Sequence, residues 1–454
     1  MHRALLAGVV LLGLTAARGA AGGEALPAHR LITLDPGHFH AALVQKSMYP
    51  NVDAVVHVYA PDGPDVDLHL ARIEGFNTRA DSPTHWQSVV YRGDDFLDKM
   101  IADKAGDIVV ISGNNARKTD YILESLQAGF NVYADKPMAT TAAQFRTLER
   151  AVALAKERRL LLLDIMTERY EITTILQREI SRVPAVYGEQ LAGSEAEPAV
   201  TKESVHHFYK VVAGKALQRP AWFFDAAQEG DGLVDVTTHL VDLVQWECFP
   251  GEIIDYHKDI VLGASSRWAT PLTLEQFRTV TGFDSLPDYL AKNYRDGVLQ
   301  VFANGEIHYA VRGIHARIRV EWAWRAPEGG GDTHYSEMHG SRAKLVIRQG
   351  EEQGYVPELS IEPNAPGSPD AAALAQALAP VFAKYPGVGI SPADGGFRVD
   401  IPDSYRVGHE AHFAQVTEAY LRYLDDGGLP DWELPDILAK YYVTTSALES
   451  ATTR

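Results

Sequence analysis

The residues best suited to chemistry in this sequence are Asp135 and Lys136, which follow the short apolar segment Asn131–Ala134. Gly129 before that segment is typical of a helix end, and Pro137 after it stops a strand. In a parallel sheet the carboxyl ends of the strands form the edge at which α/β proteins bind ligands. The sequence therefore predicts that Lys136 lies in a ligand site.

A second candidate pair is Asp235 and His239, which follow the glycines Gly230 and Gly232. Residues four positions apart share one face of a helix, so these two side chains are predicted to converge on one point. An imidazole that titrates near neutrality can remove a hydroxyl proton, and a nearby carboxylate can orient it and stabilise its charged form. The structural alternative is an amphipathic core helix, but the occurrence of this motif together with the Lys136 turn favours a catalytic pair.

These two motifs resemble the signatures of the Gfo/Idh/MocA (glucose-fructose oxidoreductase and inositol dehydrogenase) family, with Asp135 in place of that family's usual glutamate. The segment Met338–Ile347 resembles that family's late glycine turn and strand. The resemblance implies an α/β fold, with an N-terminal Rossmann-type domain and a C-terminal α+β domain built on a large, mostly antiparallel open sheet. It also implies a homo-oligomer formed through that sheet.

The resemblance further implies site residues and a cofactor. In that family the lysine lies beside the nicotinamide and the reacting sugar carbon, which makes Lys136, His239 and Asp235 the candidate catalytic residues. The candidate contacts to NAD or NADP are Gly37, Asp62, Asn115 and Asp135. An acidic residue such as Asp62 after the second strand favours NAD, because it accepts the ribose hydroxyls.

The first turn of the expected Rossmann domain departs from the family pattern. In place of Gly-x-Gly-x-x-Gly the chain has Asp35-Pro36-Gly37-His38-Phe39-His40, in which only Gly37 is retained. Asp35 puts negative charge beside the expected phosphates, and Pro36 removes a backbone donor. The turn therefore predicts impaired dinucleotide binding in the usual pose.

Histidines in this turn suggest a different use of the same crevice. His38 and His40 are predicted to face the ligand site of Lys136, where they could bind a sugar directly. Together with His206, His207, Glu168 and His239 they are candidates for an acid/base cluster, or alternatively for a divalent metal site.

Composition and the N-terminus restrict the class of protein. A chain of 454 residues with 46% apolar residues can form two domains, and a formal charge of −18 without a basic cluster argues against nucleic-acid partners. Arg3, the apolar run Ala4–Ala17 and small residues after it are typical of a signal peptide over residues 1–21, too short for a membrane span. We therefore expect a periplasmic or secreted protein. Cys248 is the only cysteine, so no intrachain disulfide can form.

The expected elements divide the rest of the chain into a Rossmann-type domain, residues 28–165, and a C-terminal domain for substrate binding and oligomerisation, residues 166–454. The first contains predicted strands at Leu31–Leu34, Val52–Tyr59, Ile108–Ser112, Asn131–Ala134 and from Leu160, with helices from Ala41 and at Thr119–Gln127 and Ala142–Lys156. The second contains predicted strands at Val298–Phe302, Ile307–Val311, Ala316–Trp324 and Lys344–Ile347, turns at Asn304-Gly305 and Gly313, a loop at Pro357–Pro369, and helices at His409–Leu424 and Leu434–Leu448.

Three functions are consistent with these features. The first is an exported oxidoreductase acting on a sugar, sugar derivative or glycoside, with a tightly held nicotinamide cofactor because free cofactor is scarce outside the cytoplasm. The second is an NAD-independent carbohydrate lyase or hydrolase, with or without a metal, that uses His38 and His40. The third is a non-catalytic sugar-binding protein, against which Lys136 and His239 argue.

Overall fold

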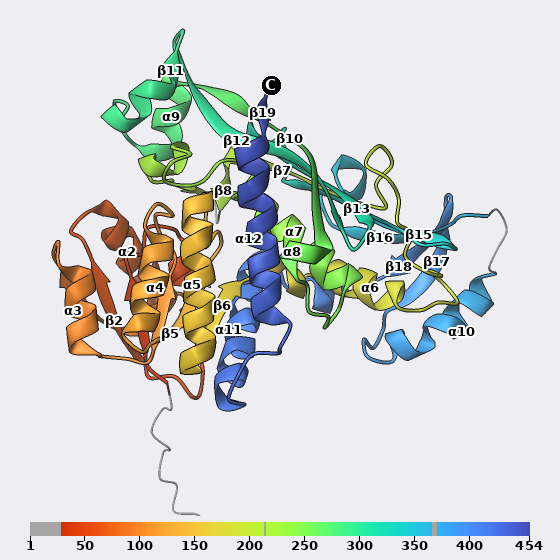
Figure 1. Cartoon of the computed structure of the whole chain (residues 1–454), viewed down its shortest axis with the longest axis horizontal. Helices are drawn as coiled ribbons and strands as arrows, with labels where there is room; N and C mark the ends of the chain where they lie inside the picture. Colours follow the sequence, from red (N-terminus) through yellow and green to blue (C-terminus); the bar gives the residue numbers. More distant parts are fainter. Residues whose placement is uncertain (1–28, 213–214, 366–369) are drawn as a thin grey trace, which may run out of the picture.

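The computed structural model describes residues 29–212, 215–365 and 370–454. The predicted signal peptide lies outside these residues. Two sheets form the framework, and helices pack between and around them (Figure 1). Among the helices of the described residues, none is long and apolar enough to cross a membrane.

The N-terminal sheet is a six-stranded parallel sheet of Rossmann type, in the order β3-β2-β1-β4-β5-β6. Its strands are β1 Leu31–Leu34, β2 Val55–Ala60, β3 Gln87–Arg92, β4 Ile108–Ile111, β5 Asn131–Asp135 and β6 Leu162–Ile165. The predicted parallel sheet is confirmed. Strand β3 was not predicted; it lies at the sheet edge, and its only apolar run is the short, mostly exposed Val89–Tyr91.

One face of the N-terminal sheet is covered in an unusual way. Helix α1, His40–Leu43, has only four residues, where a Rossmann domain has a long helix after its first strand. Helix α11, His409–Asp425, packs on the same face, and the rings of Tyr133 and Tyr420 stack at 4.6 Å. A helix from the end of the chain therefore covers the sheet where α1 is short.

The remaining helices beside this sheet are regular. They are α2 Pro64–Thr78, α3 Phe96–Asp103, α4 Lys118–Gln127 and α5 Ala142–Arg158. Helix α5 lies beside α12, Glu433–Ser450, as Figure 1 shows. This contact joins the N-terminal sheet to the C-terminal part of the chain.

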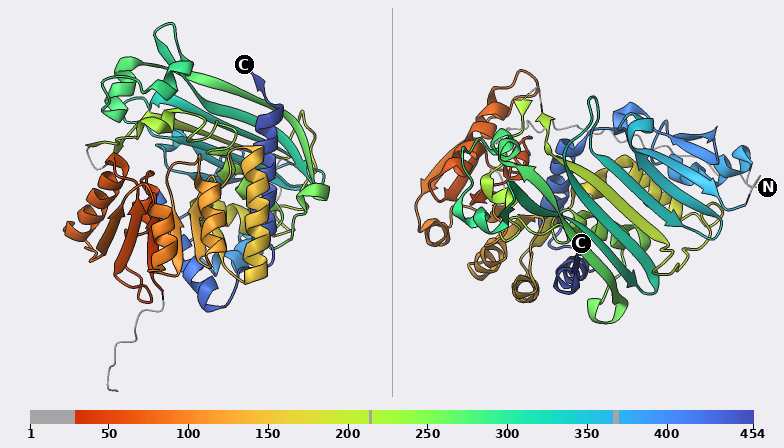
Figure 2. Two further views of the ribbon diagram at one scale, coloured as in Figure 1. Left: turned by 60° about the vertical axis from the view of Figure 1, so that its left-hand side comes forward. Right: turned by 90° about the horizontal axis from the view of Figure 1, so that it is seen from above.

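The C-terminal sheet is large and mostly antiparallel, as predicted, with the order β17-β18-β16-β15-β14-β7-β13-β12-β10-β19 and β11 beside β12. Only the β7–β13 and β10–β19 pairs are parallel. The strands are β7 Val200–Tyr209, β10 Ile260–Thr273, β11 Tyr294–Arg295, β12 Val298–Val311, β13 Ile314–Arg325, β14 Thr333–His339, β15 Ala343–Gln349, β16 Glu358–Pro363, β17 Gly389–Ala393, β18 Gly396–Asp400 and β19 Thr452–Thr453. Figure 2 shows its long strands side by side in one layer.

Two predictions about this sheet are wrong. Asn304-Gly305 is not a turn, because β12 runs through it; a Cβ on Gly305 would lie 2.5 Å from Leu233 Cδ2, so the glycine permits close packing. The predicted loop after Pro357 contains strand β16. The turn at Gly313 is confirmed, since its φ of 81° favours glycine.

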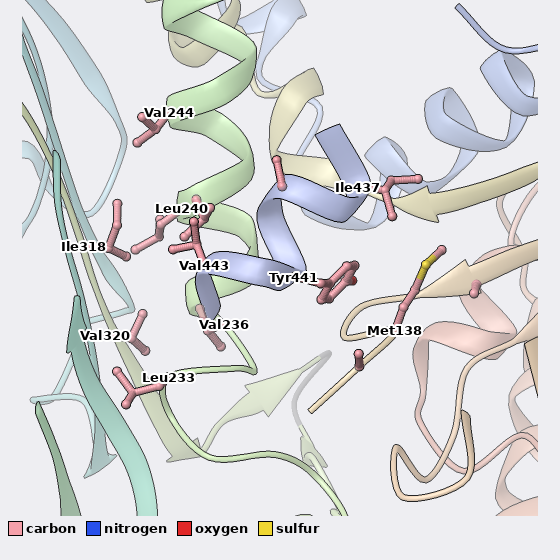
Figure 3. Packing of buried hydrophobic residues seen from close by; sticks show 14 of the residues in the cluster. Met138, Leu233, Val236, Leu240, Val244, Ile318, Val320, Ile437, Tyr441 and Val443 are labelled. Carbon is pink, nitrogen blue, oxygen red and sulfur yellow. The ribbon is translucent and has the colours of Figure 1, made fainter. Parts of the chain in front are cut away.

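The main core lies where the C-terminal sheet meets the helices. Helix α7, Thr237–Cys248, packs with Leu240 and Val244 toward β13, and α12 lies on its other side (Figure 3). The other helices of this part are α6 Ile172–Ser181, α8 Tyr256–Asp259, α9 Leu274–Thr281 and α10 Ala371–Phe382. This packing fixes α7, and with it Asp235 and His239, next to the turn that carries Lys136.

Candidate active site

A cavity of about 730 Å³ lies between the carboxyl edge of the N-terminal sheet and the C-terminal sheet. Its wall includes residues from the first turn, the β5 turn, the segment before α7, strands β7, β13 and β14, and the start of α11. Of the predicted site residues, the cavity wall contains His38, His40, Lys136, Glu168, Asp235 and His239. The structure thus brings these six predicted residues together on one cavity; their roles stay predictions.

Lys136 and Asp235 form an ion pair on the cavity wall, and each side chain is only 8% exposed. Burial opposes the charge of Lys136, but nearby acidic groups, above all the paired carboxylate of Asp235, outweigh it and raise the pKa of the lysine. Lys118 Nζ supports the turn by donating to the carbonyl oxygens of Asp135 and Lys136, at 3.0 and 3.2 Å. The ammonium group is therefore held charged and positioned for a ligand.

Glu229 is a site residue that the sequence analysis missed. Burial, and then the nearby charge of Asp235, raise the pKa of Glu229 to about 8. Its carboxyl group therefore holds a proton at neutral pH and can act as an acid in the cavity. The signal in the sequence was its position directly before Gly230, at the start of the motif that carries Asp235.

His239 lines the cavity as a neutral imidazole. Burial, and then the charge of Lys136, hold its pKa well below the usual value. Within the described residues its Nδ1 atom has no hydrogen-bond partner. The prediction that Asp235 stabilises a charged His239 is therefore wrong, because the carboxylate binds Lys136 instead.

His38, His40 and Asp135 form a buried cluster beside Lys136. Asp135 Oδ2 lies 3.0 Å from His40 Nδ1 and 3.6 Å from His38 Nδ1, and it accepts a hydrogen bond from Ser112 Oγ at 2.9 Å. Burial opposes the charge of Asp135, but His40 and other neighbours outweigh it and hold its pKa well below the usual value. Asp135, predicted as a cofactor contact, thus binds the two histidines of the first turn.

Two other predicted members of this cluster lie elsewhere. Glu168 is on the cavity wall, with Oε1 4.0 Å from Nε2 of His409. His207 is not part of the wall; it is buried, and its Nδ1 lies 2.9 Å from Oδ1 of the wall residue Asp332. Its neighbour His206 lines the cavity, and its Nδ1 lies 3.2 Å from the other carboxylate oxygen of Asp332.

The first turn does not offer the usual phosphate site. The backbone N–H groups of Gly37 and His38 donate to the carbonyl oxygen of Ser112, both at 3.3 Å. A Cβ on Gly37 would lie 3.0 Å from Trp222 Cζ2 and 3.0 Å from Asp65 Oδ2. The space over the glycine, through which a pyrophosphate would pass, is therefore filled by protein side chains.

The segment that carries Trp222, residues 218–229, is fixed in this place. Trp222 Nε1 donates to Asp65 Oδ2 at 2.8 Å. Asn115 donates from its backbone N–H to the carbonyl oxygen of Gln228 at 2.9 Å, and from Nδ2 to the carbonyl oxygen of Glu229 at 2.6 Å. Asn115, predicted to contact a cofactor, holds this segment instead.

The ribose end of the expected cofactor site is also altered. Asp62 is an exposed residue that binds Arg92, with Oδ1 2.9 Å from Nη1. With Gly37 covered and Asp62 bound to Arg92, the site does not fit a dinucleotide in the usual pose. The predicted cofactor contacts Gly37, Asp62 and Asn115 all depended on that pose. The acidic side chains Asp35 and Asp65 near the turn would also repel a pyrophosphate.

The fold is that of a Rossmann-type domain followed by a domain built on a large open sheet, and comparisons with known proteins show the family. Residues 37–163 match the family described as "Oxidoreductase family, NAD-binding Rossmann fold", and residues 176–452 match the "Putative oxidoreductase C terminal domain". The chain belongs to the Gfo/Idh/MocA family of oxidoreductases. The family description supports a nicotinamide cofactor for the fold as a class.

Solved structures extend this comparison. A "putative oxidoreductase" from Parabacteroides merdae is 56% identical over 94% of this chain and 98% of that chain, with a TM-score of 0.91. A levoglucosan dehydrogenase in complex with NADH is 13% identical over 93% and 96%, with a TM-score of 0.60. A 3-ketoreductase from Actinomadura kijaniata in complex with NADP and TDP-benzene is 14% identical over 93% and 98%, with a TM-score of 0.57. No curated protein matches the chain.

Proposed function

We propose that this protein is an enzyme that acts on a carbohydrate, sugar derivative or glycoside in the cavity described above. The observation that carries the proposal is the Lys136–Asp235 ion pair on the cavity wall, beside the protonated Glu229 and the neutral His239. A sugar binds through hydroxyl groups and apolar ring faces, and the wall offers charged donors together with Trp322 and Phe223 for those two kinds of contact.

These residues can carry the proton transfers at a sugar hydroxyl or at the carbon that bears it. Neutral His239 can accept a proton, because its imidazole is uncharged when the site is free. The charged Lys136 can stabilise the negative charge that develops on the substrate oxygen. Glu229, protonated at neutral pH, can return a proton to a leaving or product oxygen.

We infer that this chemistry proceeds without a dinucleotide in the usual pose, as in a carbohydrate lyase or hydrolase. The specific support is the covered Gly37 and the engaged N–H groups of the first turn. Family membership favours a second candidate, a sugar oxidoreductase with a retained nicotinamide cofactor. That candidate requires residues 218–229 to move away from Gly37, because Trp222 occupies the position over this glycine that a pyrophosphate would take.

We further propose that the protein is exported and assembles as a homo-oligomer. Export is supported by the basic start, apolar run and small residues within residues 1–21. Oligomerisation through the C-terminal sheet is proposed by analogy with the Gfo/Idh/MocA family, in which the open sheet is the expected subunit contact. Light scattering on the purified protein measures the oligomeric state directly.

One experiment separates the two candidate reactions. The natively purified protein is denatured, and released small molecules are identified by absorbance and mass, while the folded protein is incubated with oxidised and unoxidised glycosides and followed by NMR. Cleavage or rearrangement of a glycoside without released nucleotide supports the proposal. Stoichiometric nucleotide together with oxidised sugar supports the second candidate. Turnover that persists in Lys136→Ala contradicts the site assignment in both.

A further inference from the structure

We propose that His38, His40 and Asp135 form a binding site for one divalent transition-metal ion, open to the cavity. The ligand atoms of these three residues all lie within 4.8 Å of one another. Asp135 Oδ2 lies 3.0 Å from His40 Nδ1 and 3.6 Å from His38 Nδ1. Ligands bound at about 2.0–2.2 Å to one Zn²⁺ lie roughly 3.0–3.5 Å apart, so these separations fit a shared ion.

The hydrogen bonding of the cluster also favours a cation. His38 Nδ1 accepts from the backbone N–H of His40 at 3.4 Å, so this nitrogen carries a lone pair and no proton. It therefore faces the carboxylate oxygen of Asp135 as one acceptor facing another. A metal ion between the two atoms would replace this acceptor–acceptor contact, and the long hydrogen bond from the His40 N–H, by two favourable ligand bonds.

Neighbouring groups support Asp135 as a ligand and leave it available. Ser112 Oγ donates to Asp135 Oδ2 at 2.9 Å, which is the kind of outer contact that orients metal-binding carboxylates. The two nearby ammonium groups are directed elsewhere: Lys118 donates to backbone carbonyl oxygens, and Lys136 pairs with Asp235. Neither lysine therefore forms a direct bond to the carboxylate of Asp135 that a metal would have to replace.

The set of ligands indicates both the kind of metal and its use. Two imidazoles and one carboxylate suit Zn²⁺, Fe²⁺, Co²⁺ or Mn²⁺, and three protein ligands leave positions for water or substrate. His38 and His40 both line the cavity, so the open positions face the space beside Lys136. An ion there could polarise a substrate oxygen or lower the pKa of a bound water. The proposal concerns binding and stands independently of the proposed reaction.

The test is direct metal binding by the full protein. The purified protein is stripped with EDTA, dialysed, and titrated in separate experiments with ZnCl₂, MnCl₂ and CoCl₂ by calorimetry, and the Co²⁺ complex is also followed by visible absorption. We expect one equivalent of at least one of these metals to bind, with a rise in melting temperature. If none of the three metals binds with a Kd below about 1 mM, the proposal is overturned.

Variants locate the site. His38→Gln, His40→Gln and Asp135→Asn are each expected to weaken binding at least about tenfold. The matched control is His206→Gln, which removes another cavity histidine that binds Asp332 and not Asp135. Equal affinity in wild type and His38→Gln, or equal loss in the control, would place the metal elsewhere and contradict the proposal. If Asp135→Asn does not fold, the two histidine variants decide the outcome.

Discussion

Lys136 and Asp235 are 99 positions apart in the sequence, yet their side chains form one buried ion pair where the two sheets meet. Different elements position the two residues: Lys136 directly follows the parallel strand β5, and Asp235 lies just before helix α7. Their contact therefore depends on the packing of α7 against the N-terminal sheet. A change that disturbs this packing should also disturb the ion pair on the cavity wall.

Removal of either partner should affect stability as well as turnover. Lys136→Met and Asp235→Asn each leave one buried charge uncompensated, so the free energy of unfolding should fall by about 3 kcal/mol. Turnover should fall at least about 100-fold. Denaturant unfolding and steady-state kinetics measure the two effects.

The control for this pair is Lys99→Met, which breaks an exposed ion pair with Asp103 and should cost at most about 1 kcal/mol. The double variant Lys136→Met/Asp235→Leu should regain stability but not activity, because it removes both charges together. Normal activity in the double variant would show that the pair is structural only.

Glu229 should make stability depend on pH. Its pKa is about 8 in the folded protein and near 4.5 when exposed, so the folded state holds a proton that the unfolded state has lost between these pH values. The free energy of unfolding therefore falls as pH rises through this window. Glu229→Gln, which cannot lose a proton, should flatten that fall when the two proteins are compared from pH 5 to pH 8.

The same group should affect turnover. If Glu229 acts as an acid, activity should decline as pH rises past about 8, and Glu229→Gln should lose most activity at every pH. A variant with the same pH profile as the wild type would show that another group sets the alkaline limb.

His239→Ala should reduce turnover with little effect on stability. Its Nδ1 atom forms no hydrogen bond within the described chain, so the variant loses few polar contacts, whereas loss of a proton acceptor should lower kcat at least about 100-fold. His412→Ala is a matched control, because His412 also lines the cavity and its Nδ1 is likewise without a partner. Equal kinetic effects in the two variants would contradict the specific role of His239.

NAD should bind poorly to the wild-type protein. Because Trp222 covers Gly37, we expect no binding in calorimetry with NAD⁺ or NADP⁺ at concentrations up to about 1 mM. Tight binding that strengthens further in Trp222→Ala would show that residues 218–229 move aside, and would favour the oxidoreductase with a retained cofactor. Gly37→Val should then abolish that binding, since a side chain there blocks the backbone approach.

The sequence by itself determined the fold class and the main catalytic candidates. Apolar strands alternating with helices specify a parallel sheet, and β5 with its lysine turn could be recognised because Gly129 and Pro137 bound a short buried segment. The pattern of the C-terminal strands also predicted an antiparallel sheet, since alternation reports which face is buried. The edge strand β3 gave no such signal, because neither of its faces is fully covered.

Only the tertiary structure decided which of these residues act together. Asp235 could pair with His239 by helical spacing, but the packing of α7 brings it to Lys136; Asp135 could contact a cofactor, but it meets His38 and His40. Local spacing fixes the direction of a side chain, whereas its partner comes from chain that is distant in sequence. For the same reason the sequence did not predict the packing of α11 on the N-terminal sheet or the contact of Trp222 with Gly37. Nothing near either position in the sequence specifies these contacts.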